Sequence, residues 1–189
     1  MRIIAGNARG RRIEAPPGRS TRPTLDRVRE NLFNMIQGEV AGRNVLDLFA
    51  GSGALSFEAI SRGAAFAVMA DHDPAACKIQ RENAEGLHFD DRVRIIRSDW
   101  KRAVCLLESE GLSFDLVFLD PPYHTTQLEE IMSFINPILA PDALIILEHE
   151  SGKALPCFPA FRTVKERAWG YCAVSIFRPA RAHAEPKEE

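Results

Sequence analysis

Short apolar runs alternate with helically spaced segments along most of this chain. Each predicted strand is an apolar run of a few residues bounded by polar or turn-forming ones. The predicted strands are residues 45–49, 66–71, 93–97, 116–119 and 143–148. The helices predicted between and after them are residues 54–62, 74–86, 101–110 and 127–139. Because strand and helix alternate, we predict an α/β fold with a mostly parallel sheet.

The same patterning predicts elements at both ends of the chain. Residues 2–6 and 11–15 flank a turn-forming segment and are predicted to form a small β-hairpin. A helix is predicted from residue 24 to residue 37, with apolar side chains at helical spacing. This apolar stripe is Leu25, Val28, Leu32, Phe33 and Ile36. Residues 161–167 and 171–177 predict an antiparallel C-terminal hairpin, which brings the sheet to seven strands.

A glycine loop follows the first strand of the main sheet. The segment Asn44–Leu55 reads N-V-L-D-L-F-A-G-S-G-A-L, an apolar strand that contains Asp47 and leads into Gly51 and Gly53. Glycine allows the backbone to bend sharply and to approach a ligand closely, and helical spacing resumes at residue 54. The strand, loop and helix therefore predict a nucleotide-type pocket, with a tight structural turn as the alternative.

Asp47 favours one class of ligand for this pocket. A dinucleotide would place its pyrophosphate on the loop and the helix N-terminus, where a nearby carboxylate would repel it. S-adenosylmethionine has no phosphate, and its methionyl end carries an ammonium and a sulfonium that a carboxylate can pair with. The third glycine of a dinucleotide loop is also absent, because Ser56 stands at that position. We therefore predict S-adenosylmethionine as the cofactor.

Four predicted strands end in or beside an acidic residue. These residues are Asp47, Asp71, Asp99 and Asp120. Ligands of an open α/β sheet bind outside the carboxyl ends of its strands, so we expect the four to surround one crevice. Asp71 stands twenty residues after Gly51, a spacing typical of a carboxylate that binds ribose hydroxyls, and Asp99 could accept from the adenine amino group. Each acid taken alone could instead be a helix cap or a turn residue.

Asp120-Pro121-Pro122-Tyr123 indicates the chemistry of the site. The two prolines lack backbone N–H groups, so this segment presents carbonyl and carboxylate acceptors that can bind a planar NH2 group. Tyr123 offers a ring on which a base could stack after leaving its own stack. We expect these residues to orient a nucleobase amine toward a methyl sulfonium, mainly by positioning. The alternative is a proline turn that ends a strand.

Charge is distributed unevenly along the chain. The 189 residues carry a formal net charge of -2 and are enough for one α/β domain. Residues 1–30 hold eight arginines and three acidic residues, a local charge of +5 that leaves -7 for the remainder. We expect a basic arm at residues 1–40 that meets a polyanion, a main domain at 41–178 and a disordered tail at 179–189. The alternative for the arm is a solvated surface.

The cysteines and the apolar runs of the chain bear on metal binding and on cellular location. The four cysteines are far apart, which indicates neither a zinc site nor a disulfide framework, and we expect no metal. No apolar run approaches the length of a membrane span, and the N-terminus lacks the apolar region of a signal peptide. We therefore expect a cytoplasmic protein that binds no membrane.

Three segments together resemble the ribosomal RNA small subunit methyltransferase D family. They are R-I-I-A-G-N-A-R-G-R-R-I, T-R-P-T-L-D-R-V-R-E-N-L-F-N-M-I and V-L-D-L-F-A-G-S-G-A-L-S-F-E-A-I-S-R-G-A, joined by D-P-P-Y. The resemblance covers residues 2 to about 178. It implies a Rossmann-like class I methyltransferase fold that transfers a methyl group from S-adenosylmethionine to N2 of a guanine in 16S ribosomal RNA, guanine 966 in the family. The substrate implied is the assembled or assembling small subunit, and the enzyme is expected to be a monomer.

Carrying the family motifs over by position assigns a cofactor set and a catalytic set, and the positive charge of the arm adds an RNA-binding set. The cofactor set is Asp47, Ala50, Gly51, Gly53, Asp71, His72, Asp99 and Trp100. The catalytic set is Asp120, Pro121, Pro122 and Tyr123. The RNA-binding arginines of the arm are Arg2, Arg9, Arg11, Arg12, Arg22, Arg27 and Arg29. The family often has Glu where Asp71 stands, and Asp73 follows closely, so either carboxylate could hold the ribose.

Two other functions fit parts of this sequence. A DNA adenine-N6 methyltransferase can carry the same D-P-P-Y motif, but this chain lacks an obvious second domain for reading duplex sequence, whereas RNA in a particle can be recognised by shape and phosphate. A non-catalytic RNA-binding module is disfavoured because Asp47, Gly51, Gly53 and Asp120 are all intact.

Overall fold

Seven strands form one mixed sheet in the computed structural model, which describes residues 1–15, 23–122 and 125–180. The strands are β1 Asn44–Asp47, β2 Phe66–Asp71, β3 Val93–Arg97, β4 Phe114–Leu119, β5 Leu139–Glu150, β6 Phe161–Trp169 and β7 Cys172–Pro179. Their order is β3-β2-β1-β4-β5-β7-β6. The first five are parallel, and β7 is antiparallel to both β5 and β6. The predicted fold class is therefore confirmed, and the strand order reverses between β1 and β4, where a ligand crevice is expected.

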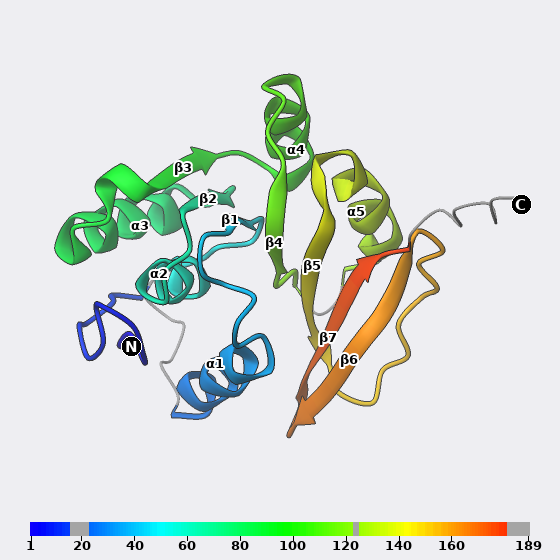
Figure 1. Ribbon diagram of the computed structural model, residues 1–189, viewed down its shortest axis with the longest axis horizontal. Coiled ribbons are helices and arrows are strands. Elements are labelled where there is room, and N and C mark those ends of the chain that lie inside the picture. The colour runs from blue at the N-terminus through cyan, green and yellow to red at the C-terminus, as the bar shows by residue number, and fades with distance from the viewer. Residues whose placement is uncertain (16–22, 123–124, 181–189) are drawn as a thin grey trace, which may run out of the picture.

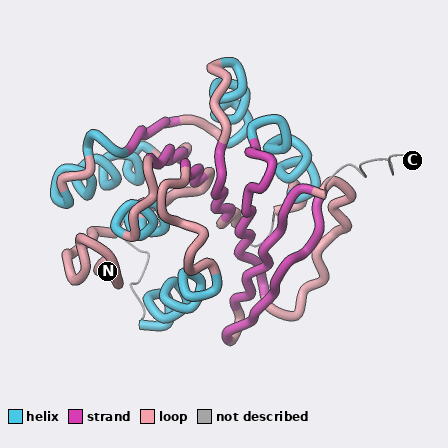
Figure 2. Tube along the Cα trace, viewed as in Figure 1, coloured by secondary structure: helices cyan, strands magenta, loops and turns pink. Residues whose placement is uncertain are grey.

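Helices cover both faces of this sheet (Figures 1 and 2). They are α1 Pro23–Met35, α2 Ala54–Ser61, α3 Pro74–Leu87, α4 Trp100–Ser109 and α5 Leu128–Ile135, with short 3-10 turns at Asp90–Arg92 and Asn136–Ile138. Side chains of α1, α2 and α3 pack with one face of the sheet, and those of α4 and α5 pack with the other. The strand residues alternate between the two clusters, because successive side chains of a strand point to opposite faces.

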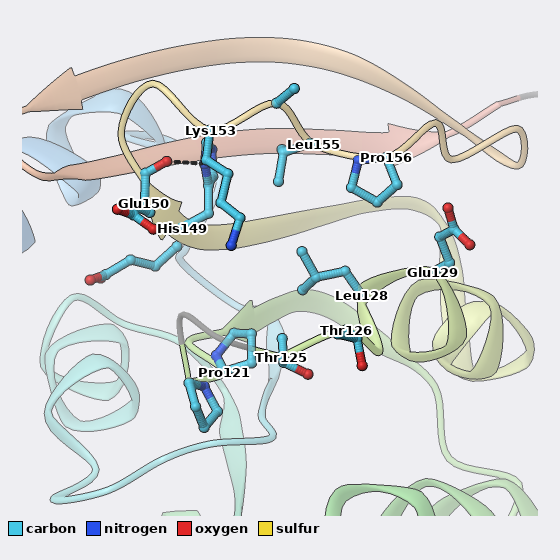
Figure 3. Close-up of a pocket in the computed structure, with 13 residues that line it drawn as sticks. Pro121, Thr125, Thr126, Leu128, Glu129, His149, Glu150, Lys153, Leu155 and Pro156 are labelled. Atoms are coloured by element: carbon cyan, nitrogen blue, oxygen red, sulfur yellow. Dashed lines mark hydrogen bonds between the residues drawn. The ribbon is translucent and has the colours of Figure 1, made fainter.

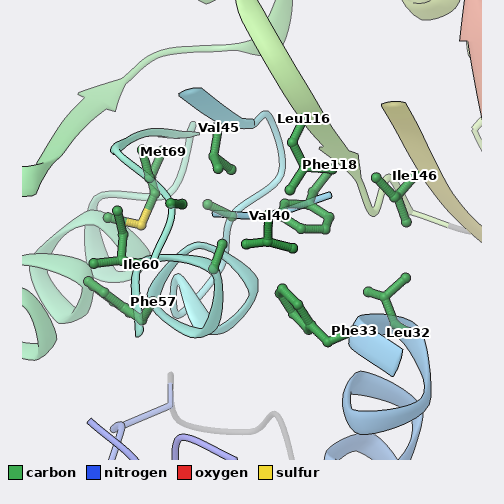
Figure 4. Close-up of a cluster of buried hydrophobic side chains, with 14 of the residues drawn as sticks. Leu32, Phe33, Val40, Val45, Phe57, Ile60, Met69, Leu116, Phe118 and Ile146 are labelled. Atoms are coloured by element: carbon green, nitrogen blue, oxygen red, sulfur yellow. The ribbon is translucent and has the colours of Figure 1, made fainter. Parts of the chain in front are cut away.

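The larger core cluster joins the N-terminal region to the sheet. Ile3 and Ile13 from the first fifteen residues, and Phe33 from α1, are buried in the same cluster as Phe57 of α2 and Phe118 of β4. The rings of Phe33 and Phe118 lie 5.8 Å apart between centroids, and Figure 4 shows them facing one another beneath the sheet. The predicted arm therefore shares its hydrophobic core with the main domain.

The N-terminal hairpin is much shorter than predicted. Its two sides pair through a single bridge, between Arg2 and Arg12. The backbone between them turns instead toward α2, where the N–H groups of Ile4 and Ala5 donate to the two carboxylate oxygens of Glu58 at 2.8 and 3.0 Å. Glu58 is fully buried, and these bonds satisfy a carboxylate that would otherwise be costly to bury. A longer ladder would need the Ala5 N–H, which Glu58 already binds.

Element ends near prolines and at the tail also differ from the predictions. The helix predicted at residues 127–139 ends at Ile135, because Pro137 has no N–H for the next helical hydrogen bond and the chain continues as a 3-10 turn. β5 begins at Leu139 rather than at residue 143. The disordered tail was predicted from residue 179. Pro179 instead ends β7, and the Ala180 N–H donates to the Ala160 carbonyl at 2.8 Å. The rest of the predicted tail lies outside the described residues.

Candidate active site

The glycine loop has the sharply turned backbone that its sequence predicts. Gly51 and Gly53 have φ angles of 53° and 79°, in the left-handed region that favours glycine. A Cβ atom at Gly53 would lie 2.7 Å from both Met69 Sδ and Phe57 Cε2, so this position is also closed to a side chain by packing. The loop ends where α2 begins at Ala54.

Three polar side chains hold the loop from the side of β2 and α3. Asp71 Oδ2 accepts from the Gly51 N–H at 2.8 Å, and Gln80 Nε2 donates to the Gly51 carbonyl at 2.9 Å. Asn83 Nδ2 donates to the Ser52 carbonyl at 3.0 Å. Gln80 and Asn83 are both buried, so their amides act as fixed supports for a loop that has few side chains of its own.

A cavity of about 500 Å³ lies outside the carboxyl ends of β1, β2 and β4. Its walls include three of the four predicted strand-end acids, Asp71, Asp99 and Asp120. The other lining residues are Leu48, Phe49, Gly51, His72, Asp73, Pro74, Ala76, Ser98, Trp100 and Pro122. The described lining contains four carboxylates and neither lysine nor arginine. Such a wall suits a cofactor that is cationic and lacks phosphate, which is the chemistry of S-adenosylmethionine.

Asp47 lies beneath the loop rather than on this wall. Its side chain is 1% exposed, and its Oδ2 accepts from Ser56 Oγ at 3.0 Å. The pKa of the Asp47 carboxyl is raised to about 7, mainly by burial, with the Ser56 hydroxyl lowering it and the nearby Asp71 raising it. Ala50 and Gly53 are part of the loop but are likewise outside the lining, so these three predicted cofactor residues do not contact the cavity directly.

The acids of the cavity wall also stabilise the local backbone. Asp71 Oδ1 accepts from the Asp73 N–H at 2.9 Å, in addition to its bond to the loop. Asp73 and Asp99 are the N-caps of α3 and α4, and accept from the N–H groups of Ala75 and Arg102. Capping and cofactor binding are compatible, because a carboxylate has about four lone-pair sites. Asp71 and Asp73 both line the cavity, so each remains a candidate for the ribose.

A second cavity, of about 240 Å³, lies on the other side of the Asp-Pro-Pro segment (Figure 3). Pro122 lines both cavities, Asp120 lines the first, and Pro121 lines the second. The remaining walls of the second cavity come from the start of α5, the end of β5 and the loop that follows it. Tyr123, which was predicted to stack on the target base, lies outside the described residues.

The predicted RNA-binding arginines differ in how much they are exposed. Arg2, Arg9 and Arg27 line one surface hollow together with Asp26 and Glu30, and Arg12 is also exposed. Arg11 is exposed, but its guanidinium donates to the carbonyls of Leu87 at 2.9 Å and Gly86 at the end of α3. Arg22 lies outside the described residues.

Arg29 is buried and is not part of this exposed surface. Only 5% of its surface is accessible, and its guanidinium contacts Asp26 at 3.0 Å and Glu58 at 3.9 Å. It also donates to the Arg2 carbonyl at 2.6 Å. The prediction that Arg29 binds RNA is therefore wrong, because its charge is already neutralised inside the protein. Its spacing, four residues from both Leu25 and Phe33, places Arg29 on the apolar stripe and is the signal for this burial, whereas the partner Glu58 comes from α2.

Several supporting residues were not predicted from the sequence. Glu58, Gln80 and Asn83 are buried polar side chains inside helical segments, and a charged or amide residue on an otherwise apolar helix face is the signal that could have identified them. Glu148 and Lys153 of the second cavity belong to no motif. Among the described residues there is no cluster of metal-ligating side chains and no helix that is both long and apolar enough to cross a bilayer.

Comparisons with known proteins agree with this geometry. The family model described as "Conserved hypothetical protein 95" matches residues 1–178. Ribosomal RNA small subunit methyltransferase D from Escherichia coli strain K12 is 37% identical over 181 residues, covering 94% of this chain and 89% of that protein. The protein of that name from Haemophilus influenzae is 33% identical over 180 residues, covering 94% of this chain and 93% of that protein. The solved structure of yhhF from Escherichia coli has a TM-score of 0.84 and 35% identity, covering 95% of this chain and 97% of that chain. The chain therefore belongs to the ribosomal RNA small subunit methyltransferase D family, with the class I methyltransferase fold and S-adenosylmethionine as its cofactor.

Proposed function

We propose that this protein methylates the exocyclic N2 of a guanine in 16S ribosomal RNA of the small subunit, at the family position, guanine 966. The observation that carries this proposal is the pair of cavities that meet at Pro122. One has an acidic wall suited to S-adenosylmethionine, and the other is open to a flat substrate. The names of the relatives from Escherichia coli and Haemophilus influenzae support ribosomal RNA as the substrate class.

The residues between the cavities have a positioning role. S-adenosylmethionine supplies an electrophilic methyl group on a sulfonium when it is bound. A guanine amine is a weak nucleophile, because its lone pair is delocalised into the ring. Acceptors at the Asp120 carboxylate and the Pro121 carbonyl would fix the two amine hydrogens, and Tyr123 would hold the ring by stacking. On the cofactor side, Asp71 would accept from the ribose hydroxyls and Asp99 from the adenine amino group.

The exposed arginines near the N-terminus would bind the RNA backbone. Arg2, Arg9 and Arg27 converge on one surface hollow, and Arg12 lies on the same N-terminal segment. Phosphate contacts by such side chains orient a nucleic acid without reading its sequence. A substrate held within an assembled or assembling small subunit suits this mode, because the particle presents the phosphates in a fixed shape. Such a substrate also places the enzyme in the cytoplasm.

Single-turnover methyl transfer tests this proposal. Small subunits from a strain that lacks the gene are mixed with the purified protein and labelled S-adenosylmethionine, and the modified nucleoside is identified by mass spectrometry. Wild-type protein is expected to form N2-methylguanosine. Asp120→Asn should slow transfer by at least tenfold while cofactor affinity is unchanged, because the change adds an NH2 group that repels the substrate amine.

Two further variants and a control complete the test. Tyr123→Phe should be mild because the stacking face survives, whereas Tyr123→Ala should lose about 1–3 kcal/mol of stacking. Asp91→Asn, an exposed acid outside both cavities, is the matched control and should react at the wild-type rate. Formation of N6-methyladenosine, or a wild-type rate for Asp120→Asn, would refute the proposed function.

A further inference from the structure

The second cavity contains charged groups to which the proposed chemistry gives no role. Glu148, near the end of β5, and Lys153, in the loop after β5, both line it together with Pro121. Much of the remaining wall is apolar or uncharged, including Leu128 and Leu155. A cavity with apolar walls and a few converging polar groups is typical of a site that orients a flat organic ligand.

The sheet register places Glu148 beside the amine-binding segment. Leu119, the last residue of β4, pairs with Leu147 of β5 in a parallel register, so Asp120 directly after β4 and Glu148 of β5 are the next residues along the two chains. Adjacent strands lie about 4.8 Å apart. The Watson–Crick edge of guanine spans a similar distance from N2 to O6, with N1 between them. An amine held at Asp120 therefore leaves the rest of that edge facing β5.

We propose that Glu148 and Lys153 recognise the Watson–Crick edge of the target guanine, with the Glu148 carboxylate accepting from N1–H and the Lys153 ammonium donating to O6. This inference rests on the proposed function, because N2 of the same edge is the atom to be methylated. Figure 3 shows the Lys153 side chain extending from its loop toward the Pro121 side of the cavity. Glu148 is half-buried, whereas Glu129 and Glu150 of the same wall are exposed. Water therefore screens the charge of Glu148 less than it screens the charges of the other two carboxylates.

This pair of charges distinguishes guanine from adenine. Guanine presents a donor at N1 and an acceptor at O6, which match a carboxylate and an ammonium. Adenine presents an acceptor at N1 and a donor at its amine, so both contacts would be reversed. A site built to hydrogen-bond one edge rejects an analogue that leaves its buried polar groups unpaired. Glu148 and Lys153 are thus specificity-determining residues, separate from the acceptors that activate the amine.

The test compares guanosine with 2-aminopurine at the target nucleotide. 2-Aminopurine keeps the amine at position 2, but its N1 is an acceptor and it lacks O6. Small subunits are reconstituted with 16S RNA that carries either base at the mapped position, and single-turnover rates are measured at saturating cofactor. The ratio of the two rates in each variant is divided by the wild-type ratio, which cancels the difference in reactivity between the two amines.

Wild-type protein is expected to prefer guanosine. Glu148→Gln should reduce this preference at least tenfold, because the Gln amide can donate to N1 of 2-aminopurine. Lys153→Met should slow transfer to guanosine about tenfold and leave the rate with 2-aminopurine unchanged, because 2-aminopurine lacks O6. Lys153 lies in an exposed loop, so this variant is a second test, independent of Glu148. Glu148→Asp should retain more of the preference than Glu148→Gln, and Glu166→Gln, on β6 outside the cavity, is the matched control.

The outcomes separate this inference from the proposed function. A wild-type enzyme that methylates guanine N2, with an unchanged preference in both Glu148→Gln and Lys153→Met, would overturn the inference alone. Wild-type protein that leaves guanosine unmethylated would overturn the proposed function and this inference with it. Isothermal titration with S-adenosylmethionine checks that each variant is folded, since neither residue lines the cofactor cavity.

Discussion

Replacing Asp47 by asparagine should change how the stability of the cofactor-free protein depends on pH. The carboxyl is buried beneath the glycine loop, and its pKa is raised from 3.8 to about 7, mainly by burial. The folded state therefore binds this proton more tightly than the unfolded state does. Its contribution to stability is fully present below pH 3.8 and is lost as the pH rises through about 7. Asparagine has no such titration.

The size of the effect follows from the two pKa values. A shift from 3.8 to about 7 is roughly three units, and each unit corresponds to about 1.4 kcal/mol, so the full loss is on the order of 4 kcal/mol. More than half of it, roughly 2–3 kcal/mol, falls between pH 5 and pH 8. The stability of Asp47→Asn relative to wild type should therefore increase by that amount over this interval.

Urea denaturation of both proteins at pH 5 and pH 8 measures this difference. Asparagine retains an acceptor for the Ser56 hydroxyl but cannot replace every bond of the carboxylate, which accepts from the Phe49 and Ser56 backbone as well. That cost does not depend on pH, and the other titrating groups are common to both proteins, so both cancel in the comparison. An equal stability gap at the two pH values, or a gap that favours wild type more at pH 8, would refute the burial argument.

Three further predictions concern the loop and the N-terminal region. Gly53→Ala should lower the free energy of unfolding by about 1–3 kcal/mol and weaken cofactor binding. Its control, Gly111→Ala, has a similar positive φ but no neighbour within 4 Å of the added Cβ, and should cost only about 1 kcal/mol. Equal losses of stability on thermal denaturation would contradict the steric explanation. Asn83→Ala should weaken S-adenosylmethionine binding about tenfold in isothermal titration, because the loop carbonyl that Asn83 supports becomes free to move, and unchanged affinity would refute this. Arg27→Gln should reduce the log-log salt slope of small-subunit binding by about 0.7–0.9 without changing stability. Arg29→Gln should instead cost about 3 kcal/mol of stability, and the opposite pattern for the two arginines would show that their roles are exchanged.

The sheet could be predicted because its strands are distinctive in sequence. The inner strands are buried on both faces, so they read as short continuous apolar runs, and each helix between them has its own spacing. The glycine loop was equally clear, since Gly51 and Gly53 both need positive φ angles. The carboxyl ends of parallel strands lie at the same edge of the sheet, so the strand-end carboxylates could be expected to lie close together, and three of the four line one cavity.

Contacts between distant segments could not be predicted in this way. Arg29 falls on the apolar stripe of α1 by its spacing, but the partner that makes its burial possible, Glu58, comes from α2 and could not be predicted from that spacing. The depth of Asp47 beneath its loop depends on how α2 packs, which a strand-end position does not specify. The second cavity joins the end of β5 to the start of α5 and the loop after β5, so its charged residues share no local pattern.

The most direct test of the central claim is nucleoside mass spectrometry of 16S ribosomal RNA from a strain that lacks the gene, complemented with either the wild-type protein or Asp120→Asn. We predict that N2-methylguanosine at one position is absent from the deletion strain, restored in full by wild type, and restored poorly by Asp120→Asn at equal protein level. Full restoration by Asp120→Asn would contradict the positioning role of the Asp-Pro-Pro segment. An unchanged level of N2-methylguanosine in the deletion strain would contradict guanine-N2 methylation of 16S ribosomal RNA by this protein.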